Sequence, residues 1–231
     1  IDKWKIYCNS LRLRMLMRVS DVPALQARVE TEIASILNNP ATYPVITDNS
    51  ENIQIEIRTL SSGRPITLNS SGFRTGLEDW QGNLAGKAMI DHMVSNSDPR
   101  LRVMFEPGEQ ADGVYMGLDP LLPSTTQQTL ADGGTISIYN RSTLSRNQYF
   151  PGVLINAAEV YFLKAEYYLK DGSDAAAETA YNEGIEQSAK QYYLFREVTN
   201  DNTTGPVDPL EDSEITDYLG EPGVAWGNAT T

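Results

Sequence analysis

One stretch of the sequence restricts the possible fold more than any other. Between residues 159 and 184, large aromatic and small residues alternate at helical spacing. Tyr161 and Tyr168 lie two turns apart, Ala165 stands between them, and Ala177 falls on a second helix. Small residues let two helices cross closely, but such a pair keeps apolar surface on its outer side. This segment is therefore predicted to stack on other helices and not to fold alone.

The layout is that of one tetratricopeptide helix pair. It departs from the consensus at two places, because Lys164 replaces the usual leucine and Ala189 replaces the closing proline. The three tyrosines of the pair have helical spacing, which favours a packing role over a ligand-binding one. These residues are Tyr161, Tyr168 and Tyr181. A second helical region elsewhere in the chain is expected to cover the pair.

Residues 2–21 predict a helix that is buried on several sides. Apolar side chains recur at helical spacing at Trp4, Tyr7, Cys8, Leu11 and Met15. Cys8 on this face is interpreted as a core residue and not as a nucleophile. Arg14 and Arg18 lie one turn apart, so they form a narrow polar stripe that needs carboxylate partners or an open edge.

A second helix is predicted to complete a hairpin over residues 1–37. Asp21-Val-Pro23 carries the start signals of a helix. Leu25, Val29, Ile33 and Ile36 then recur every three or four residues, and Asn38-Asn39-Pro40 ends the run.

Residues 38–150 change character and predict a loop-rich insertion with short strands and one helix. Apolar and polar residues alternate at 53–57, which predicts a half-buried strand. A turn at 61–65 would then allow this strand to form a hairpin with residues 66–68. A helix is predicted from about residue 84 to residue 95, and a brief strand at 135–139. A long insertion between stacked helices is where function usually lies.

Composition limits the possible partners and chemistries. The 231 residues carry a formal net charge of −13, which argues against nucleic acid and anionic lipid as main partners. One histidine, His92, and one cysteine, Cys8, exclude a zinc site of paired histidines and an internal disulfide. No metal site or cofactor is predicted. No apolar run approaches the roughly 20 residues that cross a bilayer.

The expected organisation is one mainly α domain. It consists of a helical hairpin (1–37), the insertion (38–150), the tetratricopeptide-like pair (151–195) and an acidic, loop-rich tail (196–231). The tail is interpreted as a solvated surface. Calcium binding between Asp208 and Asp217 is the alternative, but the segment lacks the alternation and the turn glycine of an EF-hand loop.

Four segments together resemble the SusD/RagB family of Bacteroidetes outer-membrane lipoproteins. The helix at residues 4–18 has the family's Asn-x-Leu-x-x-Arg core at Asn9, Leu11 and Arg14. The other segments follow in the family's order at residues 96–101, 115–117 and 158–166. The resemblance implies a C-terminal portion of such a protein, without the lipidated N-terminal cysteine, the earlier helical repeats and the final helices. The Asp98-Pro99-Arg100 part is interpreted as structural, with Asp98 capping a turn and Arg100 pairing with a carboxylate.

The resemblance also implies a function. Members of the family capture nutrient oligosaccharide or polysaccharide at the cell surface and pass it to a SusC-like TonB-dependent transporter in the outer membrane. No catalytic residue and no cofactor is implied. Contact with the membrane would be made only through a lipid anchor that this chain does not contain.

Sugar capture needs aromatic faces that stack on the C–H faces of a ring, flanked by groups that hydrogen-bond hydroxyls. One such cluster lies in the insertion, and Trp80 is its first candidate. The predicted ligand-binding residues are Phe73, Arg74, Trp80, Asn83, Tyr115 and Tyr139. Phe73 and Tyr139 flank structured segments, so a packing role is their alternative.

Two other functions remain open. A glycoside hydrolase would need two carboxylates about 5 to 9 Å apart, for which Glu78 with Asp79 or Glu106 with Glu109 are candidates. Neither pair is accompanied by a barrel-like alternation of strands and helices. A tetratricopeptide module that binds peptide or protein is the stronger alternative, although it leaves the large insertion unexplained.

Overall fold

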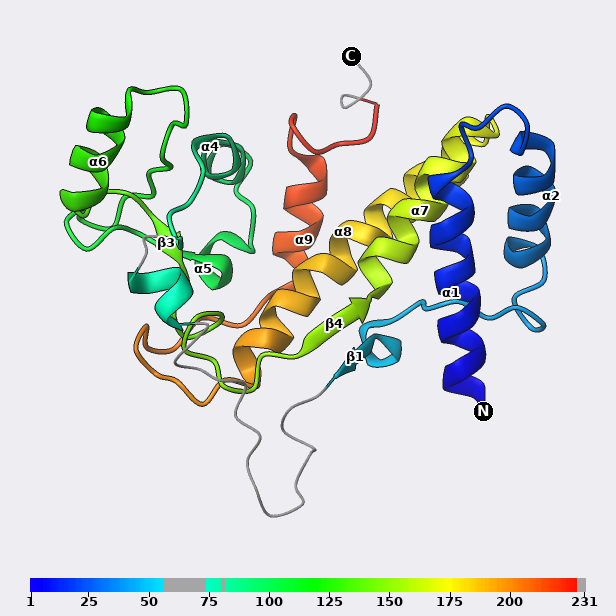
Figure 1. The fold of residues 1–231 in the computed structure, drawn as a ribbon, viewed down its shortest axis with the longest axis horizontal. Coiled ribbons are helices and arrows are strands. Elements are labelled where there is room, and N and C mark those ends of the chain that lie inside the picture. The colour runs from blue at the N-terminus through cyan, green and yellow to red at the C-terminus, as the bar shows by residue number, and fades with distance from the viewer. Residues whose placement is uncertain (56–73, 80–81, 228–231) are drawn as a thin grey trace. The chain divides into compact units, whose positions relative to one another are not determined.

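A computed structural model describes residues 1–55, 74–79 and 82–227 (Figure 1). The chain divides into two compact units. The helical unit contains Ile1–Ile55 and Gly152–Lys190, and the insertion unit contains Glu56–Pro151 and Gln191–Thr231. Helices predominate in the described residues and the strands are short, so the predicted fold class is confirmed.

The helical unit is built on helices that lie far apart in the sequence. Its elements are α1 (Asp2–Arg18), α2 (Gln26–Leu37), η1 (Asn49–Glu51), β1 (Ile53–Ile55), β4 (Gly152–Ile155), α7 (Ala157–Lys170) and the first part of α8 (Asp174–Glu197). β1 pairs with β4 in antiparallel fashion, so that Ile53 faces Ile155. The strand predicted at 53–57 begins where expected, but its partner is β4. The predicted hairpin with 66–68 lies outside the described residues.

The predicted tetratricopeptide-like pair is present as α7 and α8. The Asn156 side chain caps α7 by accepting a hydrogen bond of 2.7 Å from the Glu159 amide. Ala165 and Ala177 are buried, as their small size predicted. At Gly184 an added Cβ would lie 2.9 Å from the ring of Phe162. The two helices can therefore approach closely only because position 184 has no side chain.

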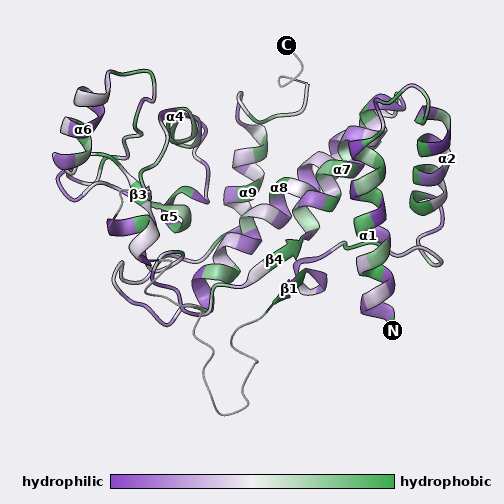
Figure 2. Ribbon diagram, in the orientation of Figure 1, coloured by the Kyte–Doolittle hydropathy of each residue, from purple (hydrophilic) through white to green (hydrophobic). Residues whose placement is uncertain are grey.

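The buried face of α1 differs from the predicted one. Ser10, Leu13 and Met17 are buried, whereas Trp4 is 69% exposed and Met15 is 61% exposed. Cys8 is also exposed, so its interpretation as a core residue is wrong. Apolar side chains surround most of this helix, and spacing alone cannot select the inward face. Figure 2 shows hydrophobic and hydrophilic residues mixed along α1.

Polar anchors explain which face of α1 turns inward. The backbone amide of Ile46 donates a buried 2.9 Å hydrogen bond to Ser10 Oγ. Asn9 Nδ2 donates to the carbonyl oxygen of Pro44 at 3.0 Å. Arg14 pairs with Glu159 of α7, so of the two alternatives for the polar stripe this residue has a carboxylate partner. A buried polar group without a partner destabilises a fold, so these bonds fix the rotation of α1.

The second helix begins later than predicted. Single turns precede it, with the Val22 amide bonded to Val19 and the Leu25 amide to Val22. The first bond of the α-helical kind runs from the Val29 amide to Leu25. α2 thus begins at Gln26, and the start signals at residues 21–23 mark a turn.

The insertion unit has short elements joined by ordered loops. They are η2 (Thr75–Asp79), α4 (Lys87–Ser95), α5 (Leu101–Met104), β2 (Phe105–Glu106), α6 (Ser124–Asp132), β3 (Ile138–Tyr139), the end of α8 and α9 (Asp212–Gly220). β2 and β3 are antiparallel. The core consists of Ala85, Ile90, Met93, Val103, Met104 and Phe105. His92 is exposed on α4. The predicted strand at 135–139 shortens to two residues.

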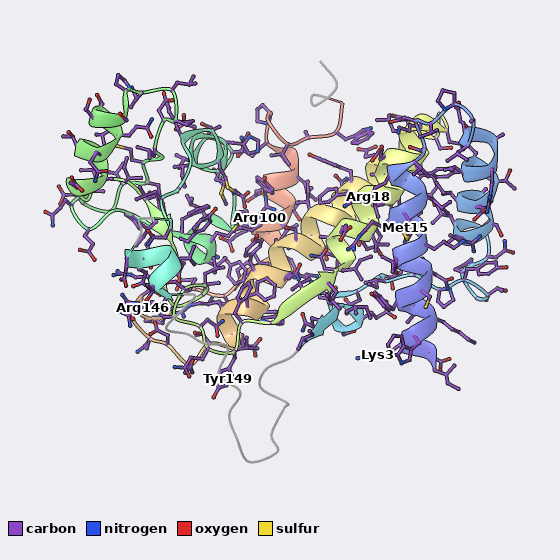
Figure 3. All side chains as sticks on the ribbon, in the orientation of Figure 1. Lys3, Met15, Arg18, Arg100, Arg146 and Tyr149 are labelled. Carbon is purple, nitrogen blue, oxygen red and sulfur yellow. The ribbon has the colours of Figure 1, made fainter. Side chains whose placement is uncertain are left out.

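The acidic tail is not a solvated loop throughout. It contains α9, which begins with a capping box between Glu211 and Glu214 and buries Ile215 and Tyr218. Figure 3 labels Arg100, whose guanidinium donates to the Tyr218 hydroxyl at 3.0 Å. The net acidity of the segment predicted solvation, but the buried apolar residues and this arginine hold the helix against the unit.

The structural interpretation of Asp98-Pro99-Arg100 is confirmed. Asp98 Oδ1 accepts 2.9 Å hydrogen bonds from both the backbone amide and Nε of Arg100. Next to this motif, Arg102 binds Glu214 of α9 at 2.7 Å. None of the helices in the described ranges is long and apolar enough to span a membrane.

The two faces of α1 differ enough for a direct test of the observed packing. Leu13→Ala should lower the free energy of unfolding by about 2 to 5 kcal/mol, because it leaves a cavity in the core. Trp4→Ala should change it by only about 0.5 kcal/mol, since the indole is exposed. Urea unfolding followed by circular dichroism measures both. If Trp4→Ala were the more destabilising of the two, the result would contradict the observed packing and support burial of the face predicted from the sequence.

Candidate functional site

The structure describes four of the six predicted ligand-binding residues, all in the insertion unit. These are Arg74, Asn83, Tyr115 and Tyr139. Phe73 and Trp80 lie outside the described residues. Trp80 directly follows η2, so the contacts of η2 show how the chain leading to it is held.

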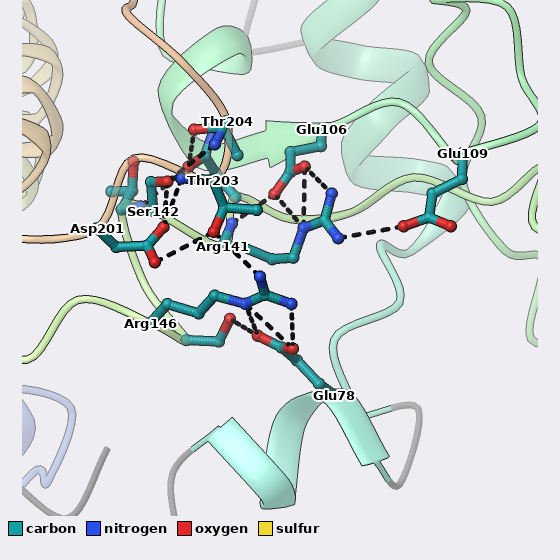
Figure 4. A network of polar contacts seen from close by, with 12 residues as sticks. Glu78, Glu106, Glu109, Arg141, Ser142, Arg146, Asp201, Thr203 and Thr204 are labelled. Atoms are coloured by element: carbon teal, nitrogen blue, oxygen red, sulfur yellow. Dashed lines mark hydrogen bonds and ion pairs between the residues drawn. The ribbon is translucent and has the colours of Figure 1, made fainter. Parts of the chain in front are cut away.

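Glu78 anchors η2 to the segment at residues 141–146. Its carboxylate accepts hydrogen bonds from Arg146 Nε at 2.9 Å and from Arg146 Nη2 at 2.8 Å (Figure 4). Ser145 Oγ donates to it at 2.6 Å, and Arg74 Nε donates at 3.2 Å. Of the predicted residues, Arg74 therefore lies next to this anchor and has an exposed side chain.

The environment of Glu78 keeps its carboxylate ionised. Burial alone would raise its pKa, but the hydrogen bonds from Arg146 and Ser145 and the charges of the two arginines outweigh burial. The pKa of Glu78 is lowered to about 2. A carboxylate of this kind is a fixed acceptor and a poor proton donor at neutral pH.

A second ion pair lies beside the first in Figure 4. Arg141 binds Glu106 through Nη2 at 2.9 Å and reaches Glu109 through Nη1 at 3.1 Å. Glu106 is largely buried, whereas the Glu109 side chain is 70% exposed. The hydrogen bonds that Arg141 donates to Glu106 raise the pKa of Arg141 despite the opposing effect of burial. Burial and the charge of Glu106 raise the pKa of Tyr115.

Asp201 closes the network from the loop that follows α8. Ser142 Oγ donates to Asp201 Oδ1 at 2.6 Å, and the Thr203 amide donates to the same oxygen at 2.9 Å. Thr203 Oγ1 in turn accepts a 3.0 Å hydrogen bond from Arg146. We call this set the arginine network: Glu78, Glu106, Glu109, Arg141, Ser142, Ser145, Arg146, Asp201 and Thr203.

The other predicted residues lie at the core of the unit. The Tyr139 ring stacks on Phe105 with centroids 5.0 Å apart, and Tyr115 packs against the same cluster. Asn83 is buried, and its carbonyl oxygen accepts a 2.8 Å hydrogen bond from the Tyr139 amide. The structure thus brings Asn83 and Tyr139 together through the backbone.

Sequence reasoning missed the arginine network. Arg141 and Arg146 flank an unremarkable run of serine, threonine and leucine. Their partners Glu106 and Glu78 lie 35 and 68 residues away along the chain. No local spacing rule relates residues so distant, so the sequence offered no signal for these pairs.

The network can hold a polar surface rigid, and its exposed members can hydrogen-bond a ligand. Its accessible groups are Glu109 and Thr203, and the exposed Arg74 lies beside it through its hydrogen bond to Glu78. Within the described ranges, no group of three or more His, Cys, Asp or Glu side chains is arranged to hold a metal ion. Paired guanidinium and carboxylate groups next to aromatic rings suit recognition of hydroxyl-rich ligands.

Together, the tetratricopeptide-like pair and the loop-rich unit define a mainly helical binding-protein fold. The family model described as "Starch-binding associating with outer membrane" matches residues 1–231. The chain therefore belongs to the SusD-like family, and its predicted membership is confirmed. The search of curated proteins gave no match.

Solved structures share this fold. A SusD homologue from Bacteroides fragilis NCTC 9343 has a TM-score of 0.74 at 20% identity, covering 98% of this chain and 48% of its own. A chitin-binding protein has a TM-score of 0.69 at 22% identity, covering 95% and 45%. A SusD homologue from Bacteroides vulgatus ATCC 8482 has a TM-score of 0.60 at 27% identity, covering 84% and 37%. The chain thus spans about half or less of the length of these structures.

The pairing of Glu78 makes stability depend on pH. Because its folded pKa of about 2 lies below the ordinary value of 4.5, its contribution is fully present above about pH 4.5 and is lost as the pH falls through about 2. That contribution is on the order of 3 kcal/mol. Glu78→Gln should remove it at pH 7 and flatten the stability profile between pH 4.5 and 2.

The matched control is Glu109→Gln, since that carboxylate is exposed and its ion pair contributes little. Urea midpoints measured from pH 2 to pH 7 compare both variants with the wild type. Equal profiles for Glu78→Gln and wild type would contradict the assignment.

Proposed function

We propose that the protein is a non-catalytic cell-surface binder of nutrient oligosaccharide or polysaccharide that delivers its ligand to a SusC-like TonB-dependent transporter in the outer membrane. The observation that carries this proposal is the family match over residues 1–231, with its printed description as starch-binding and associating with the outer membrane. The chitin-binding protein of the same fold gives further support for a carbohydrate ligand. Attachment would be through a lipid anchor outside this chain.

The electrostatics of the candidate carboxylates support binding over hydrolysis. A glycoside hydrolase needs a general acid whose pKa is raised toward the working pH. Glu78 has the opposite property, because its pKa is lowered to about 2. Glu106 and Glu109 share the guanidinium of Arg141 as an ion-pair partner. These carboxylates are suited to hold the protein's own arginines in place.

The proposed binding surface is built from residues on both sides of η2 in the sequence. We assign Trp80, which follows η2, as the aromatic platform for a sugar ring, with Phe73 and the exposed Arg74, which precede η2, as further ligand-binding groups. The Glu78 anchor supports this assignment because it fixes the chain two residues before Trp80. Fixing the chain at Glu78 lowers the conformational entropy that ligand binding costs.

Asn83, Tyr115 and Tyr139 are proposed at the inner edge of this surface. Tyr115 is half-buried, and the charge of Glu106 acts on its hydroxyl. Its ring could meet a ligand only along its exposed edge. The stacking of Tyr139 on Phe105 gives that ring a packing role in addition.

Isothermal titration calorimetry against soluble starch, chitin oligosaccharides and other glycans tests the proposal. Trp80→Ala should weaken binding about tenfold or more, because loss of a central aromatic anchor costs about 2 kcal/mol. Trp4→Ala is the matched control, since Trp4 is an exposed tryptophan of the helical unit and should leave the affinity unchanged.

A reducing-sugar assay on the same samples tests the non-catalytic part. Binding without release of reducing ends is expected. Sugar release would overturn the proposal in favour of a hydrolase. Binding of peptides but not of glycans would favour the tetratricopeptide-module alternative, and unchanged affinity in Trp80→Ala would place the platform elsewhere.

A further inference from the structure

The chain contains three Asp-Gly pairs that differ in how the glycine amide is bonded. They are Asp112-Gly113, Asp132-Gly133 and Asp171-Gly172, and all six residues are exposed. The amide nitrogen of a residue that follows an aspartate can attack the aspartate side-chain carboxyl. Glycine favours this attack, because it has no Cβ to hinder the approach or to restrict the backbone. The three pairs share this chemistry and the same access to water, so only local structure distinguishes them.

Asp112 and Gly113 are the two central residues of an exposed turn. Their φ angles are 48° and 81°, both positive as in a type I′ turn. A single backbone hydrogen bond of 2.9 Å closes the turn, from the Val114 amide to the Ala111 carbonyl oxygen. Within the described part of the chain, neither the Gly113 amide nor the Asp112 carboxylate makes a hydrogen bond or ion pair. Both reacting groups are therefore free.

The other two pairs lie at helix ends, where the glycine amide is held. At the end of α6, the Gly133 amide donates to the Thr129 carbonyl oxygen at 2.9 Å. Just after α7, the Gly172 amide donates to the Leu169 carbonyl oxygen at 3.2 Å. Each of these amides must leave its acceptor before its nitrogen can turn toward the side chain. Attack at these two pairs therefore carries the added cost of a broken hydrogen bond.

The aspartate of the α6 pair is held as well. The Asp132 carboxylate accepts a 2.8 Å hydrogen bond from Gln128 Nε2, one turn earlier in the helix. Attack on Asp112 needs rotation of its backbone, which only the hydrogen bond between Val114 and Ala111 opposes. The fold therefore leaves one of the three chemically equivalent pairs able to react.

We propose that Asp112 is a site of spontaneous isoaspartate formation, selected by the fold over the other two Asp-Gly pairs. The Gly113 amide nitrogen gives its proton to solvent and attacks Asp112 Cγ. The N–Cγ bond forms, a Cγ–O bond breaks and a water molecule leaves, which gives a cyclic imide. A water molecule from solvent then adds to the backbone carbonyl carbon and the bond from that carbon to nitrogen breaks. The main chain now runs through Cγ, a free α-carboxylate remains, and the mass of the protein is unchanged.

The modification changes the backbone of a segment that carries a predicted ligand-binding residue. An isoaspartyl link adds the Asp112 side-chain carbon to the main chain of the turn. The closing hydrogen bond from Val114 to Ala111 then no longer spans its normal ring, and Tyr115 follows directly in the sequence. Isomerisation at Asp112 therefore alters the loop that leads to Tyr115.

Peptide mapping of the folded protein after prolonged incubation at neutral pH tests the proposal. Trypsin releases residues 103–141 as one peptide, because no Lys or Arg lies between Arg102 and Arg141. Asp112 and Asp132 are thus compared within the same peptide, and Asp171 is read from another. Isomers are separated by liquid chromatography and located by electron-transfer fragmentation. Isoaspartate should accumulate at least about fivefold faster at Asp112 than at Asp132 or Asp171, the factor expected for one net hydrogen bond.

Two controls separate the fold from the local sequence. In concentrated guanidinium chloride the three pairs should react at similar rates, because each aspartate is followed by glycine. Asp112→Glu should abolish the product at position 112, since ring closure would need one more atom, and should leave Asp132 and Asp171 unchanged. Circular dichroism checks that this variant keeps its helices.

Three outcomes would overturn the proposal. Equal rates at the three pairs in the folded protein would show that the fold selects none of them. A slower reaction at Asp112 than at the helix ends would show that the turn protects it. The same preference for Asp112 in the denatured chain would assign the effect to neighbouring residues and not to the free amide.

Discussion

The burial of one side of α1 is the constraint on which the helical unit depends. Leu13 and Met17 enter a core shared with α2, α7 and β4. The pair between Arg14 and Glu159 joins positions 145 residues apart in the chain. This contact holds α7 against α1. β4 and α8 directly precede and follow α7 in the chain, and β4 pairs with β1. The same rotation of α1 that makes the core also turns Trp4 and Met15 outward.

The insertion unit is held together differently. Its strands are short and its apolar core is small, so many loop backbones have no regular ladder to join. Arginine–carboxylate pairs connect its segments through side chains: Arg100 with Asp98, Arg102 with Glu214, Arg141 with Glu106 and Arg146 with Glu78. Bidentate pairs of this kind fix geometry as well as adding energy.

The sequence by itself determined those elements whose pattern is local. The spacing of Tyr161, Ala165 and Ala177 predicted α7 and α8, and the Asp98–Arg100 motif predicted its own turn, because these patterns depend on neighbours only a few residues away. The face of α1 and the arginine network were decided by tertiary structure. α1 is apolar on most sides, so its inward face was selected by two hydrogen bonds. The Ile46 amide donates to Ser10 Oγ and Asn9 Nδ2 donates to the Pro44 carbonyl oxygen, each across about 35 positions of the chain. Glu78 and Arg146 become partners only when the chain brings them together, and no local pattern encodes a contact across 68 residues.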